Sequence, residues 1–356
     1  MSGSPPAGRS GQQASVAFLG PALGRHAGWV TTQGEVLAGL FSEAGHVTHT
    51  SSGRIAPLRR AADHAVDLVR WRRHVDVVVV SVFSGRAFLL ADESLTLARV
   101  LGLPTVAWLH GGNLPDFSQD HHRWVRRVLR HADAVVAPSA YLARWAEPLV
   151  NGVLIIPNVL DLADYPFRQR QELGPRLLWM RTFQELYDPL SAVHVLSALV
   201  RSGIEATLTM AGQDKGLLRA TQVAARDQGV ADRITFAGFV SGQEKAALLD
   251  GHDIFLNTNL VDNAPVTVLE AACSGLVVIS TDVGGLPDLL ENDVSALLVP
   301  PSDPSAMANA ARRVLADQEL AARLRGGARV VAEQSGWPAV RNQWTGLFAG
   351  LHGERK

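Results

Sequence analysis

Cysteine, lysine and long apolar runs are scarce in this chain. One of its 356 residues is a cysteine, Cys273, which excludes an intramolecular disulfide and a cysteine-built metal site and fits a reducing, cytoplasmic compartment. Its 33 basic residues nearly balance 34 acidic ones, so no overall field attracts nucleic acid or an anionic membrane. Apolar runs such as residues 77–83 fall short of the roughly 18 that a membrane-spanning helix needs. With 47% hydrophobic and 19% charged residues, the composition instead predicts a globular chain of about two domains.

Short β-branched runs alternate with longer stretches of helical periodicity, in two successive series. Strands are expected at 15–19, 46–50, 76–82, 104–109, 134–137 and 153–156, and again at 176–180, 206–211, 233–236, 253–257, 277–281 and 296–299. This alternation is typical of βαβ units with a parallel sheet covered by helices. The sequence therefore predicts an α/β protein with two doubly wound, Rossmann-like domains facing an interdomain cleft. Ligands of such sheets bind beyond the carboxyl ends of the strands.

The domain boundaries are predicted from where the hydrophobic pattern stops. The expected parts are a disordered tail (1–14), an N-terminal domain (15–165), a C-terminal domain (166–335) and a terminal helix (336–356). The polar stretch 161–174 carries no hydrophobic period, and hinge motion is expected there. Near the end, Trp337, Val340, Trp344 and Phe348 have helical spacing. This spacing predicts an amphipathic helix and leaves open which domain it docks on.

Two candidate ligand-facing positions follow strands of the first half. Gly24 lies in the glycine-bearing turn 20–28, where the backbone can approach a ligand closely, although plain chain reversal is an equal alternative. This turn is not the dinucleotide fingerprint, and the chain has no Walker A sequence. His110 follows the strand expected at 104–109 and precedes two glycines. Its imidazole could position a substrate hydroxyl or share a proton, or be an ordinary loop histidine.

Arg181 and Lys215 are the candidate phosphate contacts of the second half. Arg181 comes directly after the strand expected at 176–180, and a guanidinium at a strand end suits a bidentate grip on phosphate. Lys215 follows Gly212 in the turn after the next strand and is one of three lysines in the chain. A solvated surface lysine is the alternative for Lys215.

The segment from Asp262 to Glu270 carries the most information. Asn263 and Pro265 mark a helix start, which puts Thr267 where free amides and the helix dipole favour an anion. Asp262 precedes this helix and Glu270 lies about a turn inside it, so one carboxylate could meet a sugar and the other a ribose. An N-cap acid followed by a buried acid is the structural alternative.

Together these residues resemble the family-4 retaining glycosyltransferases of GT-B fold, over about residues 15–351. The most specific matches are GQDKG, DRITFAGFV, DNAPVTVLEAACSGLVVISTDVGGLPDLL and ALLVPPSDP, and HGG, APSAYL, IPNVLDLADY and GWPAV also match. The resemblance implies that a sugar is transferred from a nucleoside diphosphate donor, with retained anomeric configuration and no required metal ion or other cofactor. It also implies that the last helix crosses back to the N-terminal domain.

The resemblance assigns roles to individual residues. Glu270 matches the carboxylate that binds the donor ribose, Arg181 the diphosphate-binding arginine, and His110 the histidine near the donor sugar. The loop and helix start that bind sugar and phosphate correspond to Asn263, Ala264, Pro265, Val266 and Thr267. Two positions depart from the family: Asp262 stands where a glutamate is usual, and Tyr187 where a lysine is usual. The combination of R-x5-Y with D-N-x-P is typical of a branch of the family.

The predicted partners are a nucleotide-sugar donor and a carbohydrate, lipid-linked or small-metabolite acceptor, without nucleic acid. The arginine-rich stretches 59–73 and 123–130 have helical spacing and are interpreted as solvated faces, with peripheral membrane contact as the alternative. Two other functions remain open: a GT-B sugar-nucleotide epimerase, and a catalytically silent GT-B protein that binds a nucleotide-sugar or supports a partner enzyme.

Overall fold

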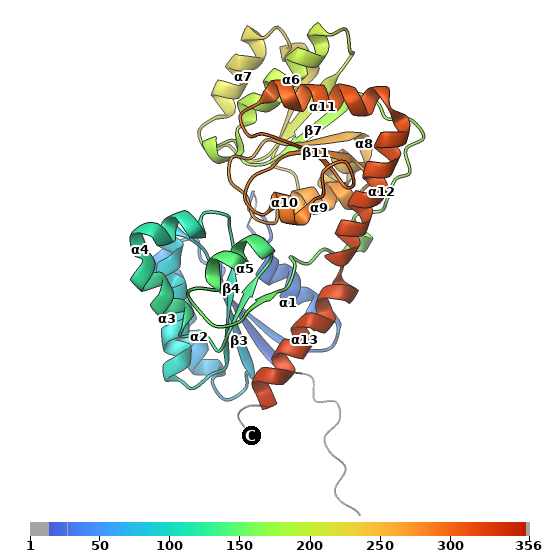
Figure 1. The fold of residues 1–356 in the computed structure, drawn as a ribbon. Helices are drawn as coiled ribbons and strands as arrows, with labels where there is room; N and C mark the ends of the chain where they lie inside the picture. The colour runs from blue at the N-terminus through green and yellow to red at the C-terminus, as the bar shows by residue number, and fades with distance from the viewer. Residues whose placement is uncertain (1–13, 27, 354–356) are drawn as a thin grey trace, which may run out of the picture.

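Two parallel sheets form the framework of the protein (Figure 1). The structure is a computed structural model that describes residues 14–26 and 28–353, so the tail expected at 1–14 lies, apart from Ala14, outside the described residues. Within them, the first sheet contains β1 (Ser15–Leu19), β2 (Val47–Ser51), β3 (Val77–Val82), β4 (Thr105–Leu109), β5 (Ala134–Ala137) and β6 (Val153–Ile155). The second contains β7 (Arg176–Met180), β8 (Thr207–Ala211), β9 (Ile234–Gly238), β10 (Ile254–Asn257), β11 (Val277–Thr281) and β12 (Leu297–Val299). The α/β fold with two doubly wound domains is confirmed.

The strand orders define where each sheet can bind a ligand. The first sheet has the order β2-β1-β3-β4-β5-β6 and the second β12-β11-β10-β7-β8-β9. Every strand pair is parallel, so all carboxyl ends in a sheet meet at one edge. The chain order reverses between β1 and β3 in the first sheet and between β7 and β10 in the second. Such switch points are where doubly wound sheets bind ligands.

Helices cover both faces of each sheet. They are α1 (Gln33–Glu43), α2 (Pro57–Trp71), α3 (Phe88–Val100), α4 (Leu114–Leu129), α5 (Ala140–Ala146), α6 (Pro189–Arg201), α7 (Leu218–Asp227), α8 (Gly242–Gly251), α9 (Val266–Cys273), α10 (Leu286–Leu289), α11 (Pro304–Ala316), α12 (Gln318–Gln334) and α13 (Trp337–Gly353). Alternating residues of one strand serve both faces: Ala107 and Leu109 of β4 pack toward α2–α5, and Val106 and Trp108 toward α1 and α13. This alternation explains why the buried strands are apolar throughout.

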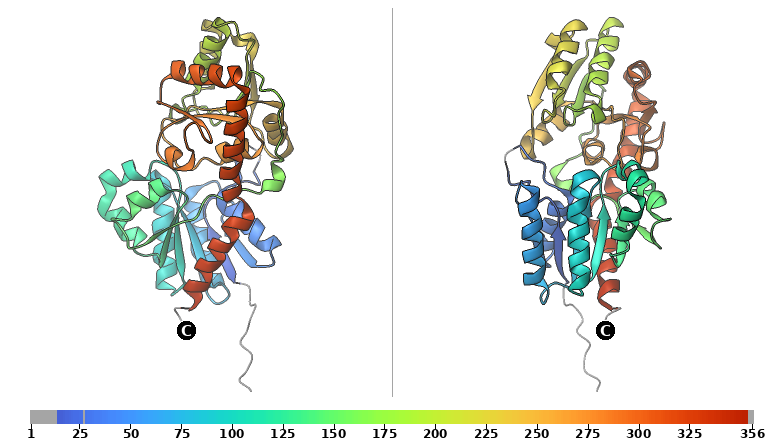
Figure 2. Two further views of the ribbon diagram at one scale, coloured as in Figure 1. Left: turned by 45° about the vertical axis from the view of Figure 1, so that its right-hand side comes forward. Right: turned by 90° about the vertical axis from the view of Figure 1, so that its left-hand side faces the viewer.

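The terminal helix α13 docks on the N-terminal domain, as the resemblance implies. It runs from the end of α12 down along the first sheet (Figures 1 and 2). Its apolar stripe is buried there, and the Trp344 ring lies 5.1 Å from that of Trp108 on β4. Trp337 makes an edge contact with Phe41 of α1 at 4.9 Å. The apolar spacing read from the sequence is therefore the packing face.

The two chain segments that connect the domains are hydrogen-bonded to each other. The amide of Leu160, on the first crossing, donates to Ser335 O at 2.8 Å, and the amide of Trp337, on the second, donates to Leu160 O at 3.2 Å. Leu160 and Gly336 thereby form a parallel bridge. The two crossings are one local structural unit.

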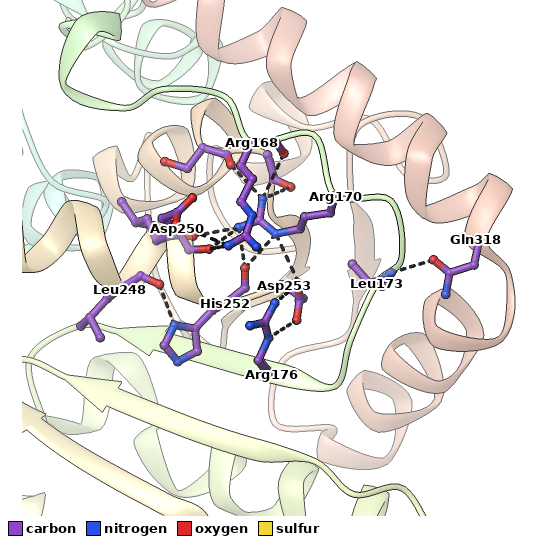
Figure 3. Close-up of polar contacts among 12 residues, drawn as sticks. Arg168, Arg170, Leu173, Arg176, Leu248, Asp250, His252, Asp253 and Gln318 are labelled. Atoms are coloured by element: carbon purple, nitrogen blue, oxygen red, sulfur yellow. Dashed lines mark hydrogen bonds and ion pairs between the residues drawn. The ribbon is translucent and has the colours of Figure 1, made fainter.

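The polar stretch after the first crossing is anchored to the C-terminal domain (Figure 3). The guanidinium of Arg170, 2% exposed, donates to the carbonyls of Leu249, His252, Ser274 and Gly275 at 2.9 Å. Its Nε also lies 3.3 Å from Oδ1 of the fully buried Asp253, which Arg176 grips at 2.6 and 3.0 Å. A buried arginine saturated by carbonyls thus ties the second half of the stretch 161–174 to the C-terminal domain. Hinge motion within this stretch stays a prediction.

The arginine-rich helices α2 and α4 present most of their guanidinium groups to solvent, with one exception. Arg60 is 9% exposed and donates from Nε and Nη2 to Arg54 O at 3.1 and 2.8 Å, so it caps the preceding loop instead of facing water. The expectation of a solvated face is therefore wrong for this residue. Among the residues described, no helix is both long and apolar enough to cross a bilayer.

Candidate active site

Arg181 and Asp262 meet where the strand order of the second sheet reverses. Arg181 directly follows β7 and Asp262 lies in the loop after β10, the neighbouring strand. The Arg181 Nη2 donates to Asp262 Oδ2, and both side chains are 14% exposed. Asn259 Nδ2 donates to the same oxygen, and the Asn263 amide donates to Oδ1 at 2.8 Å. Two opposite charges are thereby held at the edge where a ligand is expected.

The aromatic ring of Tyr187 packs against the guanidinium group of this pair. The guanidinium carbon of Arg181 lies 4.9 Å from the centre of the Tyr187 ring, which is a cation–π contact. Burial raises the pKa of the Tyr187 phenol, so the ring stays neutral at physiological pH. A neutral ring orients the guanidinium without cancelling its charge.

Glycines clamp the loop that carries Asp262. A Cβ added at Gly284, where φ is +56°, would lie 1.9 Å from Asp262 O, and one at Gly285 would lie 2.3 Å from Asn263 O. From the N-terminal domain, a Cβ at Gly112 would come within 2.8 Å of the Asp262 carbonyl carbon. Only residues without a side chain allow the three backbones to approach this closely. Gly112, the second glycine after His110, therefore contacts the loop of the opposite domain.

Two polar side chains of the N-terminal domain bind the same loop. Ser139 Oγ donates to Asn263 Oδ1, and Asn158 Nδ2 donates to Ala264 O at 2.8 Å. Ser139 and Asn158 are each 7% exposed. Both domains thus hold the loop, and the carboxyl edges of the two sheets face each other across it.

The helix after this loop begins at the expected position. Pro265 is the N-cap of α9, so Val266 and Thr267 occupy the first helical positions, whose amides have no carbonyl partner within the helix. The Thr267 hydroxyl oxygen is buried and has no hydrogen-bond partner among the described residues. Free amides, the helix dipole and this hydroxyl form a site suited to an anion.

Glu270 lies one turn into α9 and is 4% exposed. Its Oε1 accepts from the Tyr165 hydroxyl at 2.9 Å and from Lys245 Nζ at 2.5 Å. Its Oε2 is buried and has no partner among the described residues. Burial, together with the Glu270 charge, raises the pKa of Tyr165, which therefore remains a hydrogen-bond donor.

His110 is packed between aromatic rings at the carboxyl end of β4. It stacks on Phe83 with ring centres 4.8 Å apart and lies 4.4 Å from the Trp108 ring. Burial lowers the pKa of His110 to about 3, so the imidazole is neutral near pH 7. Its Nε2 is buried without a partner in the described part of the chain. A neutral imidazole in this setting can exchange hydrogen bonds with a hydroxyl but carries no charge.

The remaining candidates have structural contacts of their own. The Gly24 amide donates to the carboxylate of Glu35 at 3.1 Å, so in this structure that donor is occupied. Gly212 permits a close approach, since a Cβ there would lie 1.8 Å from Arg181 O. The Lys215 ammonium lies 5.7 Å from the centre of the Trp29 ring, which belongs to the N-terminal domain.

The structure thus brings Arg181, Tyr187, Asp262 and Asn263 into one cluster. Four contributors were not predicted as site residues: Lys245, Tyr165, Ser139 and Asn158 all act on partners distant in the chain. The matching segments APSAYL and IPNVLDLADY contain the last three and were the signal that could have identified them. The scarcity of lysine was a signal that could have directed attention to Lys245. Over residues 14–26 and 28–353, no group of three or more His, Cys, Asp or Glu side chains is arranged to hold a metal ion.

Comparison with known proteins shows what this chain is similar to. Residues 175–317 match the family model described as "Glycosyl transferases group 1". The chain is 26% identical over 292 residues to a glycogen synthase of Mycobacterium tuberculosis, covering 76% of this chain and 69% of that protein. It is 29% identical over 292 residues to a D-inositol 3-phosphate glycosyltransferase of Xylanimonas cellulosilytica, covering 75% and 69%.

Solved structures share the whole fold. A sucrose-phosphate synthase from Thermosynechococcus elongatus superposes with a TM-score of 0.79 at 16% identity, covering 96% of this chain and 100% of that one. HepE of Anabaena, in complex with UDP and glucose, superposes with a TM-score of 0.72 at 16% identity, covering 95% and 100%. At such identities the likeness shows the GT-B fold. The second domain thus matches the group 1 glycosyltransferase model, and the chain as a whole shares the GT-B fold of these structures.

Proposed function

We propose that this protein transfers a sugar from a nucleoside diphosphate sugar to a hydroxyl group of an acceptor, with retention of anomeric configuration and without a required metal ion. The observation that carries the proposal is the convergence at one sheet edge of a largely buried arginine, a helix N-terminus, and a buried carboxylate with one oxygen that no described residue engages. The arginine and the helix N-terminus match the diphosphate of such a donor, and the carboxylate matches its ribose.

In this proposal the C-terminal domain binds the donor. The amides of Val266 and Thr267 and the guanidinium of Arg181 bind the diphosphate, because charge-assisted hydrogen bonds to phosphate are the strongest available there. The free Oε2 of Glu270 accepts from ribose hydroxyls. Lys215, on the neighbouring loop, adds a cation when the domains close. The positive charge comes from side chains and backbone dipoles, which supports independence from a metal.

The chemical step then relies on preorganised charge. The bond between the sugar C1 and the diphosphate oxygen breaks as the acceptor oxygen bonds to C1 from the same face, and the acceptor proton passes to an oxygen of the departing diphosphate. Arg181 and the helix N-terminus stabilise the charge that develops on the leaving group. His110, held neutral, positions a sugar hydroxyl, and Asp262 holds Arg181 and the sugar in register. Closure of the domains excludes water, whose attack would compete with transfer.

The acceptor is a carbohydrate, a lipid-linked sugar or a small metabolite, bound by loops of the N-terminal domain. Relatives whose names specify D-inositol 3-phosphate and glycogen support this range of hydroxyl-bearing acceptors. Loops at the carboxyl edge of the first sheet, around Gly24 and after β3, face the proposed donor site and would select among them.

Thermal unfolding with UDP, GDP, ADP and TDP, each with and without EDTA, tests the donor site. A ligand at 100 times its dissociation constant adds about 2.7 kcal/mol of stability. We expect one nucleotide to raise the melting temperature and EDTA to leave that shift unchanged. The matching nucleotide-sugar, incubated with candidate acceptors and followed by proton NMR, should then give a product with the donor's anomeric configuration. No shift with any nucleotide would favour a silent scaffold, and conversion of the donor sugar without an acceptor would favour an epimerase.

A further inference from the structure

Lys245 contacts the carboxylate that the proposed function gives to the ribose. It lies on α8, and its ammonium nitrogen is 2.5 Å from Glu270 Oε1 and 5.3 Å from the centre of the Tyr165 ring. The Tyr165 hydroxyl donates to the same Oε1 at 2.9 Å. One oxygen of the carboxylate is thus fully engaged by a cation and a phenol from two other parts of the domain.

The second oxygen of Glu270 is free. Oε2 is buried, in a side chain that is 5% exposed, and it has no hydrogen-bond partner among the described residues. A buried acceptor without a partner is costly, by an amount that a hydrogen-bonding ligand would recover. The asymmetry of the contacts therefore leaves one defined acceptor at a fixed place.

The position of Lys245 suits a role in which it supports the Glu270 carboxylate. Its side chain is 23% exposed and therefore mostly buried, and its ammonium group contacts both Glu270 and the Tyr165 ring. A buried carboxylate without a counter-charge is strongly unfavourable, and removing one partner of such a pair leaves the other uncompensated. Lysine is also rare in this chain, with three in 356 residues.

We propose that Lys245, together with Tyr165, is a positioning residue that balances the charge of Glu270 and fixes its orientation, so that Oε2 is presented to the ribose hydroxyls of the donor. This inference rests on the proposed function, because it takes Glu270 as the ribose ligand. Because Lys245 acts through Glu270, its contribution to binding affinity depends on whether the ligand carries the ribose hydroxyl that Glu270 binds.

The test compares ribo- and deoxyribonucleotides. The probe is the nucleoside diphosphate that gives the largest thermal shift, together with its 2′-deoxy and 3′-deoxy analogues, and dissociation constants are measured by titration calorimetry on the full chain. For the wild-type protein we expect at least one analogue to bind about ten- to a hundredfold more weakly, the effect of losing a hydrogen bond to a charged group. The ratio to be compared is the dissociation constant of that deoxy analogue divided by that of the ribonucleotide. For Lys245→Met we expect this ratio to fall to about three or less, while the affinity for the deoxy analogue changes little.

Matched variants separate positioning from a general loss of structure. Lys245→Arg keeps the charge and should restore part of the discrimination between ribo- and deoxyribonucleotides. Tyr165→Phe removes the other donor to Oε1 but keeps the ring under Lys245, and it should lower the ratio even if Lys245→Met folds poorly. Glu244→Gln changes an exposed neighbour on the same helix and should leave the ratio at its wild-type value.

The outcomes distinguish this inference from the proposed function. If Glu270→Ala, which removes every hydrogen-bonding atom of the side chain, abolishes the discrimination while folded Lys245→Met and Tyr165→Phe keep it, the role of Lys245 is refuted and the ribose site stands. If Glu270→Ala discriminates as the wild type does, Glu270 is not the ribose ligand, and both this inference and that part of the proposed function fail. A collapse of the ratio in all three variants, with partial recovery in Lys245→Arg, supports the inference.

Discussion

The guanidinium of Arg181 is paired with the carboxylate of Asp262 at the switch point of the second sheet, and both side chains are largely buried. The arginine that we propose to bind the diphosphate is therefore paired with a carboxylate of its own domain. The carboxylate offsets the charge that a diphosphate would use, and it also fixes the orientation of the guanidinium. Binding and turnover should respond in opposite directions when this carboxylate is neutralised.

Asp262→Asn tests this relationship. Asparagine keeps the size of the side chain and one of its two acceptor oxygens but removes the negative charge, so the full Arg181 charge becomes available to a diphosphate. We expect affinity for the preferred nucleoside diphosphate to rise about three- to tenfold, which corresponds to roughly 0.6–1.4 kcal/mol. Transfer should fall at least tenfold, because the sugar loses an anionic contact. Calorimetry and a transfer assay measure both, with Asp227→Asn, an exposed carboxylate on α7, as the control; a lowered affinity would contradict the prediction.

Substitutions at Tyr187 separate the ring from its hydroxyl. Tyr187→Phe preserves the cation–π contact with Arg181 and should leave nucleotide affinity within about twofold. Tyr187→Ala removes the contact and should weaken binding by about two- to thirtyfold, the equivalent of about 0.5–2 kcal/mol. Titration calorimetry with the preferred nucleoside diphosphate provides the comparison. Equal losses in both variants would show that the hydroxyl, not the ring, matters.

Asp253 is expected to contribute strongly to the stability of the C-terminal domain. Asp253→Asn leaves the buried Arg170 without its counter-charge, and breaking a buried pair in this way costs about 3–5 kcal/mol. Chemical denaturation monitored by circular dichroism measures the loss. Asp250→Asn, at an exposed carboxylate paired with Arg168, should change the free energy of unfolding by less than about 0.5 kcal/mol. A similar effect of the two substitutions would argue against the role given to the buried cluster.

Asn158→Ala probes the hold of the N-terminal domain on the Asp262 loop. The substitution leaves Ala264 O without its donor at a buried interface, and we expect a rise in the donor KM of about five- to thirtyfold, about 1–2 kcal/mol. Small-angle scattering of the unliganded variant should show a larger radius of gyration. Gln119→Ala, at an exposed position of α4, is the control. An unchanged KM and scattering profile would mean that this contact does not couple the domains.

Two buried histidines predict loss of stability in mild acid. Burial lowers the pKa of His64 from 6.5 to about 4 and that of His110 to about 3, so below pH 6.5 the unfolded chain binds protons that the folded chain refuses. Stability therefore falls as the pH drops from 6.5 toward 4, by about 2 kcal/mol for each histidine at pH 5. His64→Gln should flatten this dependence in urea titrations at several pH values. His74→Gln, at an exposed position, should not, and parallel curves for all three proteins would contradict the prediction.

The fold was predictable because its signals are local. The ends of each expected strand lie within two residues of those of an observed strand. Strands of a parallel sheet are buried on both faces, so they appear in the sequence as short apolar, β-branched runs such as that of β3. The helix start at α9 was predictable for the same reason, from Asn263 and Pro265. Arg60 shows the limit of such signals, because burial of its guanidinium depends on the path of the Arg54 loop.

The site was predictable only in part. Residues at strand ends, such as Arg181 and His110, are identified by their position after an apolar run. The pairing of Lys245 with Glu270 joins residues of two helices, 25 positions apart in the chain, and that of Ser139 with Asn263 joins two domains. Neither pairing leaves a pattern in the chain, because it depends on how helices and domains pack. The orphaned oxygens of Glu270 and Thr267 are visible only once those partners are in place.

The hydrogen-bonded crossing at Leu160 and Gly336 has a consequence for any movement between the domains. Two independent connections would permit sliding and twisting, whereas two connections bonded to each other act as one pivot. We expect opening and closing to reduce to rotation about a single axis next to α13, so that one angle sets the separation of the two domains. A substitution at the pivot would then change the separation of the two facing sheet edges without altering a residue at either edge.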